Sequence, residues 1–186
     1  MPKITYTTSK GQSGEVQGSD GRIDTSARVS SRLYYVSRDD GEAYTVISND
    51  ASAAAGTHIA YWQNTDSTGR VLVIESVSMS GVETALWKVH RVTGTAAAGS
   101  LITPSNCNAT SSNASSSIAR GDDSITGLSI ASTYFTGRSA ANGQPIVFDT
   151  KSSLIIGQNQ AISVEYDTGT TGIAEVTIIG HFETPS

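Results

Sequence analysis

The 186-residue chain has one cysteine and few charged residues, and each shortage excludes a class of protein. Cys107 alone can build neither an intrachain disulfide framework nor a cysteine-based zinc site, and a single thiol is typical of a chain made in a reducing cytoplasm. Charged residues make up 16% of the chain, its net charge is −5, and Lys and Arg form no cluster. We therefore expect no nucleic-acid partner, because phosphates require a basic face.

Long apolar runs are missing as well. The opening residues, MPKITYTTSKGQSGEVQGSDG, contain no apolar segment of the kind found in signal peptides. No run elsewhere approaches the length of a membrane span. We therefore expect a soluble protein without a membrane partner.

The residues that are present favour β-strands. Within the stretch TALWKVHRV, Ala85, Trp87 and Val89 share one face of a strand, and Lys88 and His90 take the other. Similar segments follow one another along the chain, separated by Gly, Asp, Ser and Asn turns. Two of them alternate in the same way: Ile162, Val164 and Tyr166 share one face, and Ala174, Val176, Ile178 and Phe182 share one face. The expected strands are residues 33–37, 42–49, 57–64, 70–79, 84–92, 124–130, 132–137, 145–150, 154–166 (a hairpin broken at GQNQ) and 172–183.

This series of strands predicts an all-β fold. About eight to ten strands at spacings of roughly 8 to 15 residues are typical of an antiparallel β-sandwich or barrel. We expect a jelly-roll-like β-sandwich, with an immunoglobulin-like sandwich as the second choice because the chain lacks the Cys…Trp…Cys spacing. The Ala-rich stretches ASAAAG and GTAAAG are too short to nucleate a helix alone.

The first residues follow a different pattern. Between Lys10 and Ser31 neither the strand period nor the helix period persists. We expect residues 1–32 to form an extended N-terminal arm and residues 33–186 to form the sandwich domain. The arm would order against a partner; the alternative is a frayed terminus.

A long polar stretch, Thr103–Asp123, interrupts the strands. Its small side chains bury little apolar surface, while ordering it costs about 1–2 kcal/mol of backbone entropy per residue. Loops of this length are usually functional or mobile. We expect it to pack against a neighbouring subunit or to lie on a rigid scaffold, the alternative being a surface loop without function.

The region Val82–Leu128 resembles small β-rich structural proteins of tailed-bacteriophage virions. In that family a strand of the type x-L-W/Y-K-x-x-R-V-T-G leads into a loop with a Pro-x-Asn motif and a run of Ser, Asn and Ala. Here the corresponding segments are VETALWKVHRVTGTAAAG, then ITPSNCNATSSNASSSIARGD, then ITGL.

The resemblance implies a capsid decoration (cement) protein, made in the host cytoplasm and located on the capsid surface of the virion. It further implies a jelly-roll body, a homotrimer, the major capsid protein as partner, and no cofactor. By region, we assign capsid binding to arm residues, namely Lys3, Ile4, Tyr6, Val16, Ile23 and Val29. By region, we assign self-association to residues in or near the polar stretch, namely Pro104, Asn106, Asn108, Asn113 and Arg120.

A receptor- or glycan-binding module of a head or tail fibre is the second hypothesis. Aromatic residues could form a sugar-binding platform, although core packing is the more frequent role of aromatic residues on alternating strands. The candidates are Trp62, Trp87, Tyr61, Tyr134 and Phe135. Against a fibre stalk, the arm lacks coiled-coil heptads.

Several short motifs resemble binding, modification or metal sites, but each has an explanation without such a function. The tripeptide RGD at Arg120–Asp122 is expected in a turn before a strand, and the Asn-x-Ser/Thr sequons would not meet the glycosylation machinery without a signal peptide. The three histidines, His58, His90 and His181, lie on separate strands without metal-ligand spacing, so we expect no metal site.

Catalytic signatures are also missing from the sequence. There is no G-x-S-x-G nucleophile elbow, and Cys107 has no local His. The acidic pairs Asp39-Asp40 and Asp122-Asp123 lack the alternating pattern of a calcium loop, and nothing favours the paired carboxylates of a glycosidase. We therefore expect a binding protein that is not an enzyme.

Overall fold

A computed structural model describes residues 4–7, 13–16, 32–81, 84–140, 143–168 and 171–185. The chain divides into two units, Met1–Ser31 and Arg32–Ser186, one residue from the expected boundary. In the first unit, strands β1 (Ile4–Thr7) and β2 (Ser13–Val16) pair antiparallel. The remainder of the expected arm lies outside the described residues, so its extended conformation stays a prediction.

The second unit consists of β-strands and one short helical segment. The helical segment comprises α1 (Arg32–Tyr35) and the wider π-type turn η1 (Val36–Asp40). The long strands are β3 (Ala43–Ala53), β4 (Thr57–Asn64), β5 (Val71–Gly81), β6 (Leu86–Thr93), β9 (Ser117–Ile125), β10 (Ser129–Arg138), β11 (Ile146–Ile156), β12 (Ala161–Thr168) and β13 (Gly172–Glu183). Two short strands, β7 (Ser100–Ile102) and β8 (Ser105–Asn106), lie between β6 and β9.

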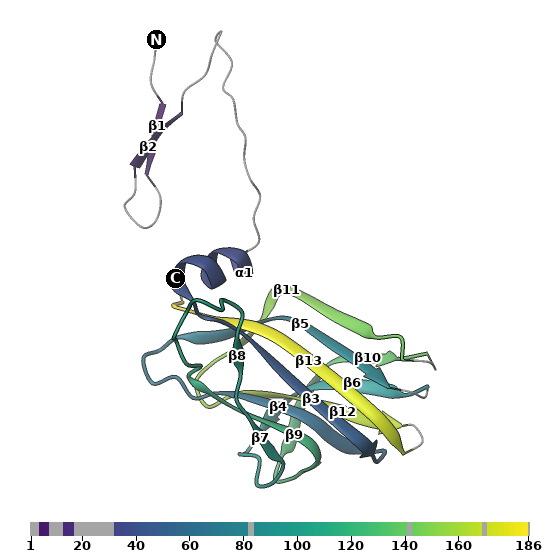
Figure 1. The fold of residues 1–186 in the computed structure, drawn as a ribbon. Coiled ribbons are helices and arrows are strands. Elements are labelled where there is room, and N and C mark those ends of the chain that lie inside the picture. The colour runs from purple at the N-terminus through teal and green to yellow at the C-terminus, as the bar shows by residue number, and fades with distance from the viewer. Residues whose placement is uncertain are drawn as a thin grey trace. The chain divides into compact units, whose positions relative to one another are not determined.

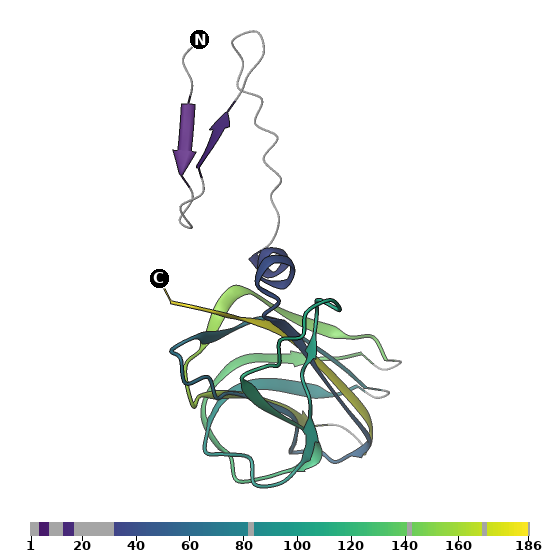
Figure 2. The same ribbon diagram turned by 60° about the vertical axis from the view of Figure 1, so that its left-hand side comes forward.

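The strands form two antiparallel sheets that pack face to face (Figures 1 and 2). The six-stranded sheet has the order β10-β6-β12-β4-β9-β7, and the five-stranded sheet has the order β11-β5-β13-β3-β8. In Figure 1 the five-stranded sheet faces the viewer, with β13 crossing it in yellow. The expected all-β sandwich is confirmed.

The connectivity is that of a jelly roll. The eight principal strands form nested antiparallel pairs, β3 with β13, β4 with β12, β5 with β11, and β6 with β10. Successive strands cross from one sheet to the other, as in a single long hairpin rolled into two layers. Segments β7, β8 and β9 are an insertion between β6 and β10, and they extend both sheets at the same side of the sandwich.

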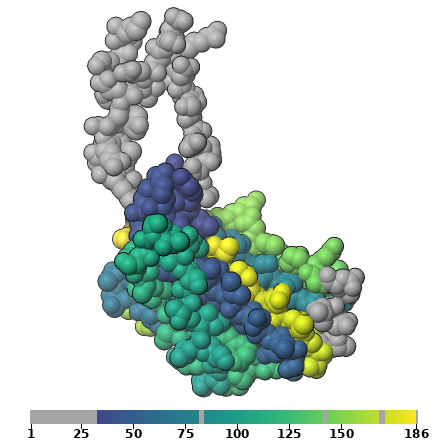
Figure 3. Space-filling model, viewed as in Figure 1, coloured from purple at the N-terminus to yellow at the C-terminus, as the bar shows by residue number. Residues whose placement is uncertain are grey.

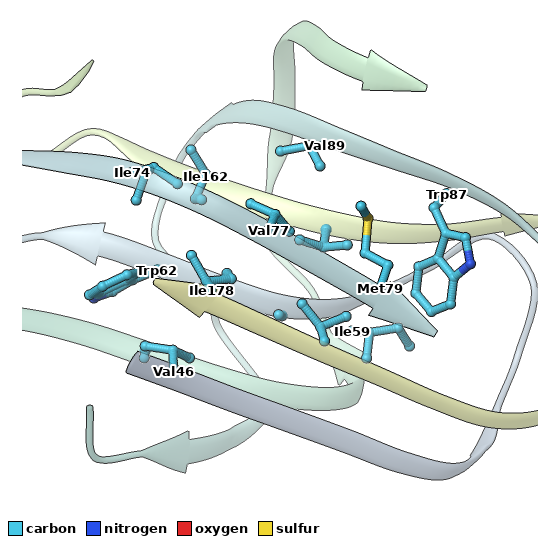
Figure 4. Packing of buried hydrophobic residues seen from close by; sticks show 14 of the residues in the cluster. Val46, Ile59, Trp62, Ile74, Val77, Met79, Trp87, Val89, Ile162 and Ile178 are labelled. Carbon is cyan, nitrogen blue, oxygen red and sulfur yellow. The ribbon is translucent and has the colours of Figure 1, made fainter. Parts of the chain in front are cut away.

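Alternating residues of the two inner faces form one hydrophobic core (Figure 4). The core faces predicted from alternation are confirmed for β6, β12 and β13, whose inward residues include Trp87, Val164 and Ile178. The indole of Trp62 lies against Gly180, where a Cβ would come 2.7 Å from the Val73 carbonyl oxygen. Only glycine therefore allows β13 to approach the core this closely.

Two expected local structures were wrong. Residues 33–37 are helical, not a strand, and Gly41 ends this helical segment in the left-handed conformation with φ +63°. The expected hairpin at residues 154–166 does not exist, because β11 pairs with β5 and β12 pairs with β4 and β6. Local alternation sets the inward face of each strand but does not select its partner.

The polar stretch is more ordered than expected. Strand β9 starts at Ser117, seven residues before the strand expected from Ser124, and it pairs with both β4 and β7. Its inner face needs only Ala119 and Gly121, because β9 lies beside the end of the core and not over its centre. Because both residues are small, the sequence shows no clear alternation of apolar and polar side chains here, and the strand was not predicted.

Each edge strand of the two sandwich sheets is short or irregular, which disfavours pairing with a further strand. The edge strands β7 and β8 are only 3 and 2 residues long. The edge strand β10 has two register shifts against β6, and β11 is interrupted between Asp149 and Leu154. Interactions with other proteins are therefore more suited to the faces of the sandwich than to its edges.

Candidate protein interaction surfaces

The helical segment α1–η1 lies at one end of the five-stranded sheet (Figure 3). It is anchored by Val36, which is buried, while Tyr34, Tyr35 and Arg38 point to solvent. The last carbonyl groups of a helix have no partner within it and must be satisfied from outside. The structure satisfies them from a distant part of the chain.

The loop Asn106–Asn113 supplies these partners. The side-chain amide of Asn108 donates to the Ser37 carbonyl at 3.0 Å, and that of Asn113 donates to the Asp40 carbonyl at 3.0 Å. The Asn106 amide donates to the Gly41 carbonyl at 2.7 Å. We call this set of three amide contacts the asparagine clamp.

The same loop is also organised by its own side chains. The Asn106 carboxamide oxygen accepts the Asn108 N–H at 2.8 Å, and the Asn108 oxygen accepts the N–H and hydroxyl of Thr110. These are the local turns that Asn and Ser side chains form with nearby backbone. The Asn- and Ser-rich composition therefore has a structural explanation within the chain.

The predicted self-association residues thus have partners in their own chain. Asn106, Asn108 and Asn113 form the clamp, the Arg120 guanidinium donates to the Gly99 carbonyl at 2.8 Å, and Pro104 is half-buried. The loop lies on a rigid scaffold, one of the two arrangements expected for it. A contact between this loop and a neighbouring subunit stays a prediction.

Beside the clamp, an open depression of about 350 Å³ lies between the helix and the loop. Its walls include Tyr34, Arg38 and Asn108. The guanidinium of Arg38 lies over the rings of both Tyr34 and Tyr35, at 5.1 and 5.4 Å from the centroids. Tyr and Arg are enriched among the residues that dominate protein–protein binding energies.

The predicted capsid-binding residues fall only partly within the described ranges. Ile4 and Tyr6 belong to β1, Val16 belongs to β2, and Ile4 lies opposite Val16. Lys3, Ile23 and Val29 lie outside the described residues. Their role in capsid binding stays a prediction.

The RGD tripeptide is built into strand β9 and not into a turn before it, which corrects the expectation. Asp122 has φ +73°, and its carboxylate accepts the N–H groups of Ser100 and Ser124, each at 2.8 Å. Burial raises the pKa of Asp122, but these hydrogen bonds outweigh it and lower the pKa to about 2. The Arg and Asp side chains are both engaged within the chain.

The proposed aromatic sugar platform is not present. Tyr61, Trp62 and Trp87 are fully buried. The indole N–H of Trp62 donates to Ser117 Oγ at 2.7 Å, and that of Trp87 donates to Ser139 Oγ at 3.0 Å. These three residues are structural, and among the five candidates only Tyr134 is exposed, with Phe135 half-buried.

Two histidines that the sequence placed apart meet on the outer face of the six-stranded sheet. The rings of His58 and His90 are 6.1 Å apart between centroids. Ser163 Oγ lies 2.8 Å from His58 Nδ1, and His90 Nε2 lies 2.7 Å from the Glu165 carboxylate. The alternation of the sequence predicted that His90 lies on the face opposite to Trp87, but not that it lies close to His58.

This Ser–His–Glu arrangement does not have the geometry of a catalytic triad. The carboxylate contacts His90, whereas the hydroxyl contacts His58, so the two pairs are not in series. Ser163 is fully buried and also lies 3.0 Å from the Ala60 carbonyl oxygen, to which it donates. Burial is the main cause that lowers the pKa of His58, and the neighbouring His90 lowers it further. The cluster joins three strands and holds them together.

The third histidine is on the other sheet. His181 is fully buried, with Nδ1 3.1 Å from a Glu75 oxygen and Nε2 3.5 Å from a Glu183 oxygen. Neither ring nitrogen makes a hydrogen bond to these carboxylates, so they are close contacts only. Among the described residues, no three His, Cys, Asp or Glu side chains gather in a way that could hold a metal ion.

The central part of the outer face of the five-stranded sheet is open to solvent. The register aligns Ile47, Thr177, Ser78 and Val147 in one row across β3, β13, β5 and β11. Ile47 is 60% exposed and Val147 is 57% exposed. Directly paired residues point to the same side of a sheet, so the row forms a continuous surface.

Comparisons with known proteins add no family assignment. No protein-family model, curated protein or solved structure matches the chain. Within the described ranges, the helical segments are too short and too polar to cross a lipid bilayer. The fold and its surfaces therefore carry the functional argument.

Proposed function

We propose that the protein is a structural virion component that binds the assembled capsid surface of a tailed bacteriophage and stabilises it. The observation that carries the proposal is the distribution of side chains in the sandwich domain. Exposed apolar and aromatic residues lie on its outer surfaces, whereas its histidines and Ser163 are engaged within the chain. Such a surface is suited to contact with proteins.

The resemblance of Val82–Leu128 to phage virion proteins supplies the identity of the partner, the major capsid protein. A jelly roll is compatible with that role, because viral capsid domains are among the proteins that use this architecture. Fold alone does not define function, so the partner rests on the resemblance. Self-association of the chain is part of the same proposal.

The proposed mechanism is mass action. A ligand that binds only the assembled shell stabilises it by RT ln(1 + [L]/Kd), and several linked copies raise the effective affinity. Residues 1–31 are the candidate attachment segment, and the Tyr34–Arg38 surface lies immediately after them in the chain. The sandwich domain contains its own core.

Co-sedimentation with empty shells tests this proposal. The shells are assembled from the major capsid protein encoded nearest to this gene. The full chain should bind saturably, and removing residues 1–31 should weaken binding by about tenfold or more, since each 1.4 kcal/mol of lost contact is tenfold. The variant Leu101→Glu, changed at a 74% exposed residue of β7, is the matched control. Full-length protein that stays in the supernatant would contradict the proposal.

One observation favours the alternative, a receptor- or glycan-binding fibre module. Tyr34 and Tyr35 are adjacent, exposed aromatic rings beside a depression, and sugars commonly stack on such rings. Their rings are tilted by 74° to each other, which leaves no single flat platform. Binding to a glycan array that is lost in Tyr34→Ala, with no binding to shells, would favour this alternative.

A further inference from the structure

The outer face of the five-stranded sheet has a pattern that is complementary to itself. In the row described above, the order across the strands is Ile47, Thr177, Ser78, Val147: apolar at both ends and hydroxyl in the middle. A two-fold axis that runs parallel to the strands would place Ile47 of one copy over Val147 of the other. The same axis places Thr177 over Ser78. Contacts of this isologous kind require such self-complementarity.

The neighbouring rows are not symmetric in the same way, and the axis places Ile179 over Ser76, but it also places their carboxylates over hydroxyl groups. On one side the row is Thr45, Ile179, Ser76, Asp149, and this axis lays Asp149 over the Thr45 hydroxyl of the other copy. On the other side, Glu175 comes over Ser80. Within these three rows, each of the two carboxylates, Asp149 and Glu175, therefore lies over a hydroxyl group, and neither lies directly over another carboxylate.

The alternative two-fold axis, perpendicular to the strands, is unfavourable. It would place Glu175 over Ile179 of the other copy, so a carboxylate would lose water without gaining a partner. Within each copy, Ser80 Oγ donates to the Glu175 carboxylate at 3.2 Å. This contact shows that the two side chains can pair. A hydroxyl has one proton to donate, so in the pair of copies each Ser80 donates either to its own Glu175 or to the Glu175 of the other copy.

We propose that two copies of this chain pair face to face through the five-stranded sheets, with their strands related by a two-fold axis parallel to the strands. The side-chain pattern selects a second copy as the occupant, because the Ile47 row complements its own reverse and the reversed neighbouring rows place Asp149 and Glu175 over hydroxyl groups. The inference does not depend on capsid binding. It contrasts with the homotrimer that the resemblance implies, since a two-fold contact makes dimers.

The pairing is weak in solution. The three rows span four strands and about five residues, roughly 15 Å by 15 Å at ordinary strand spacings. This is well below the ~800 Å² per partner of a standard stable interface, so we expect a dissociation constant on the order of tens of micromolar or weaker. On a surface that concentrates many copies, the same contact becomes effective.

Sedimentation equilibrium of the full chain between about 1 and 500 μM tests the pairing, a range that brackets the expected dissociation constant. The wild type should pass from monomer to dimer. Ile47→Glu should raise the dissociation constant by about tenfold or more, because two glutamates per dimer enter an apolar contact. Leu101→Glu, at an exposed residue of the other sheet, should leave it unchanged. Circular dichroism and thermal unfolding check that each variant is folded.

A mixing experiment tests the orientation. Ile47→Glu chains and Val147→Lys chains should each dimerise poorly alone, but an equimolar mixture should form a heterodimer, with one Glu–Lys pair and one native Ile–Val contact. If the axis were perpendicular to the strands, residue 47 would meet residue 47 and mixing would restore nothing. A wild type that stays monomeric at the highest concentration, or that forms trimers without dimers, overturns the proposal. So does an Ile47→Glu variant that loses shell binding while its self-association is unchanged, because the face would then belong to the shell.

Discussion

The outer faces of the two sheets differ in how far the chain covers them. At the centre of the six-stranded sheet, Tyr61, His90 and Val92 are buried although they point away from the core. The insertion between β6 and β10 covers Tyr61 and Val92 with Ala96, Ile125 and part of the Leu128 side chain, forming a second hydrophobic cluster. At the centre of the five-stranded sheet, nothing in the described chain covers the Ile47 row.

The difference shows which outward residues make contacts within the fold and which remain exposed to other molecules. Outward residues on the covered face act within the fold, as the His58–Ser163 and His90–Glu165 contacts do. Outward residues on the open face contribute little to folding and are available to another chain.

Substitutions on the covered face should reduce the free energy of unfolding as much as substitutions in the core. Tyr61→Ala removes a fully buried ring between Val92 and Ile125 and should reduce the free energy of unfolding by about 3–5 kcal/mol. Urea denaturation followed by fluorescence measures the change. A loss below ~1 kcal/mol, the size expected for surface sites, would mean that the insertion does not cover this face.

The asparagine clamp should have an intermediate effect. The double variant Asn108→Ala, Asn113→Ala leaves the Ser37 and Asp40 carbonyls without these amide donors and should destabilise the helical segment by about 1–3 kcal/mol. Hydrogen exchange by mass spectrometry should show faster exchange in residues 33–42. Asn159→Ala, in the β11–β12 turn, serves as an amide-loss control that should leave these residues unchanged. Equal exchange in the double variant and the wild type would contradict the clamp.

Acid should destabilise the protein through His58 on the covered face. The pKa of His58 is lowered in the folded protein, mainly by burial, so the unfolded chain binds the proton more readily. Stability from this residue is therefore complete above the ordinary pKa of about 6.5 and is lost as the pH falls below it. His58→Gln should flatten this part of the pH dependence in urea denaturation between pH 7.5 and 5. Parallel curves for wild type and variant would contradict the assignment.

The open face should tolerate truncation. Ile47→Ala removes a side chain that is 60% exposed and should change the free energy of unfolding by no more than about 0.5 kcal/mol in dilute solution. The same urea assay at low micromolar concentration measures it. A loss as large as that of Tyr61→Ala would show that the two faces do not differ.

Much of the fold could be predicted from the sequence because the chain alternates strictly in its central strands. The inward residues of β6 and β12 point into the core as predicted, because each of these strands has one side exposed to water and one side packed against the core; they include Ala85, Trp87, Val89, Ile162 and Val164. Partner choice could not be predicted, because β11 and β12 look like a hairpin in sequence yet join different sheets. The helical segment at residues 33–40 was missed because its stability comes from tertiary contacts of Val36 and the asparagine clamp.

The candidate surfaces were less predictable than the fold. The composition of residues 103–123 indicated a loop of special role, but the targets of Asn108 and Asn113 lie about seventy residues earlier in the chain. Likewise, the Ile47 row is assembled from four strands, and no local pattern connects Ile47 with Val147. Both surfaces depend on which distant segments pair and in which register. The alternation of apolar and polar residues within one segment does not show this pairing.

Carbene footprinting of the full chain at two concentrations tests the central claim most directly. Between low micromolar and several hundred micromolar protein, on either side of a dissociation constant on the order of tens of micromolar, labelling of Ile47 and Val147 should fall while labelling of Leu101 stays constant. Tyr61 should be unlabelled at both concentrations, because the chain itself covers it. Labelling of Ile47 and Val147 that does not change with concentration, or of Tyr61 at the level of Leu101, would contradict the distinction between a covered face and an open, self-pairing one.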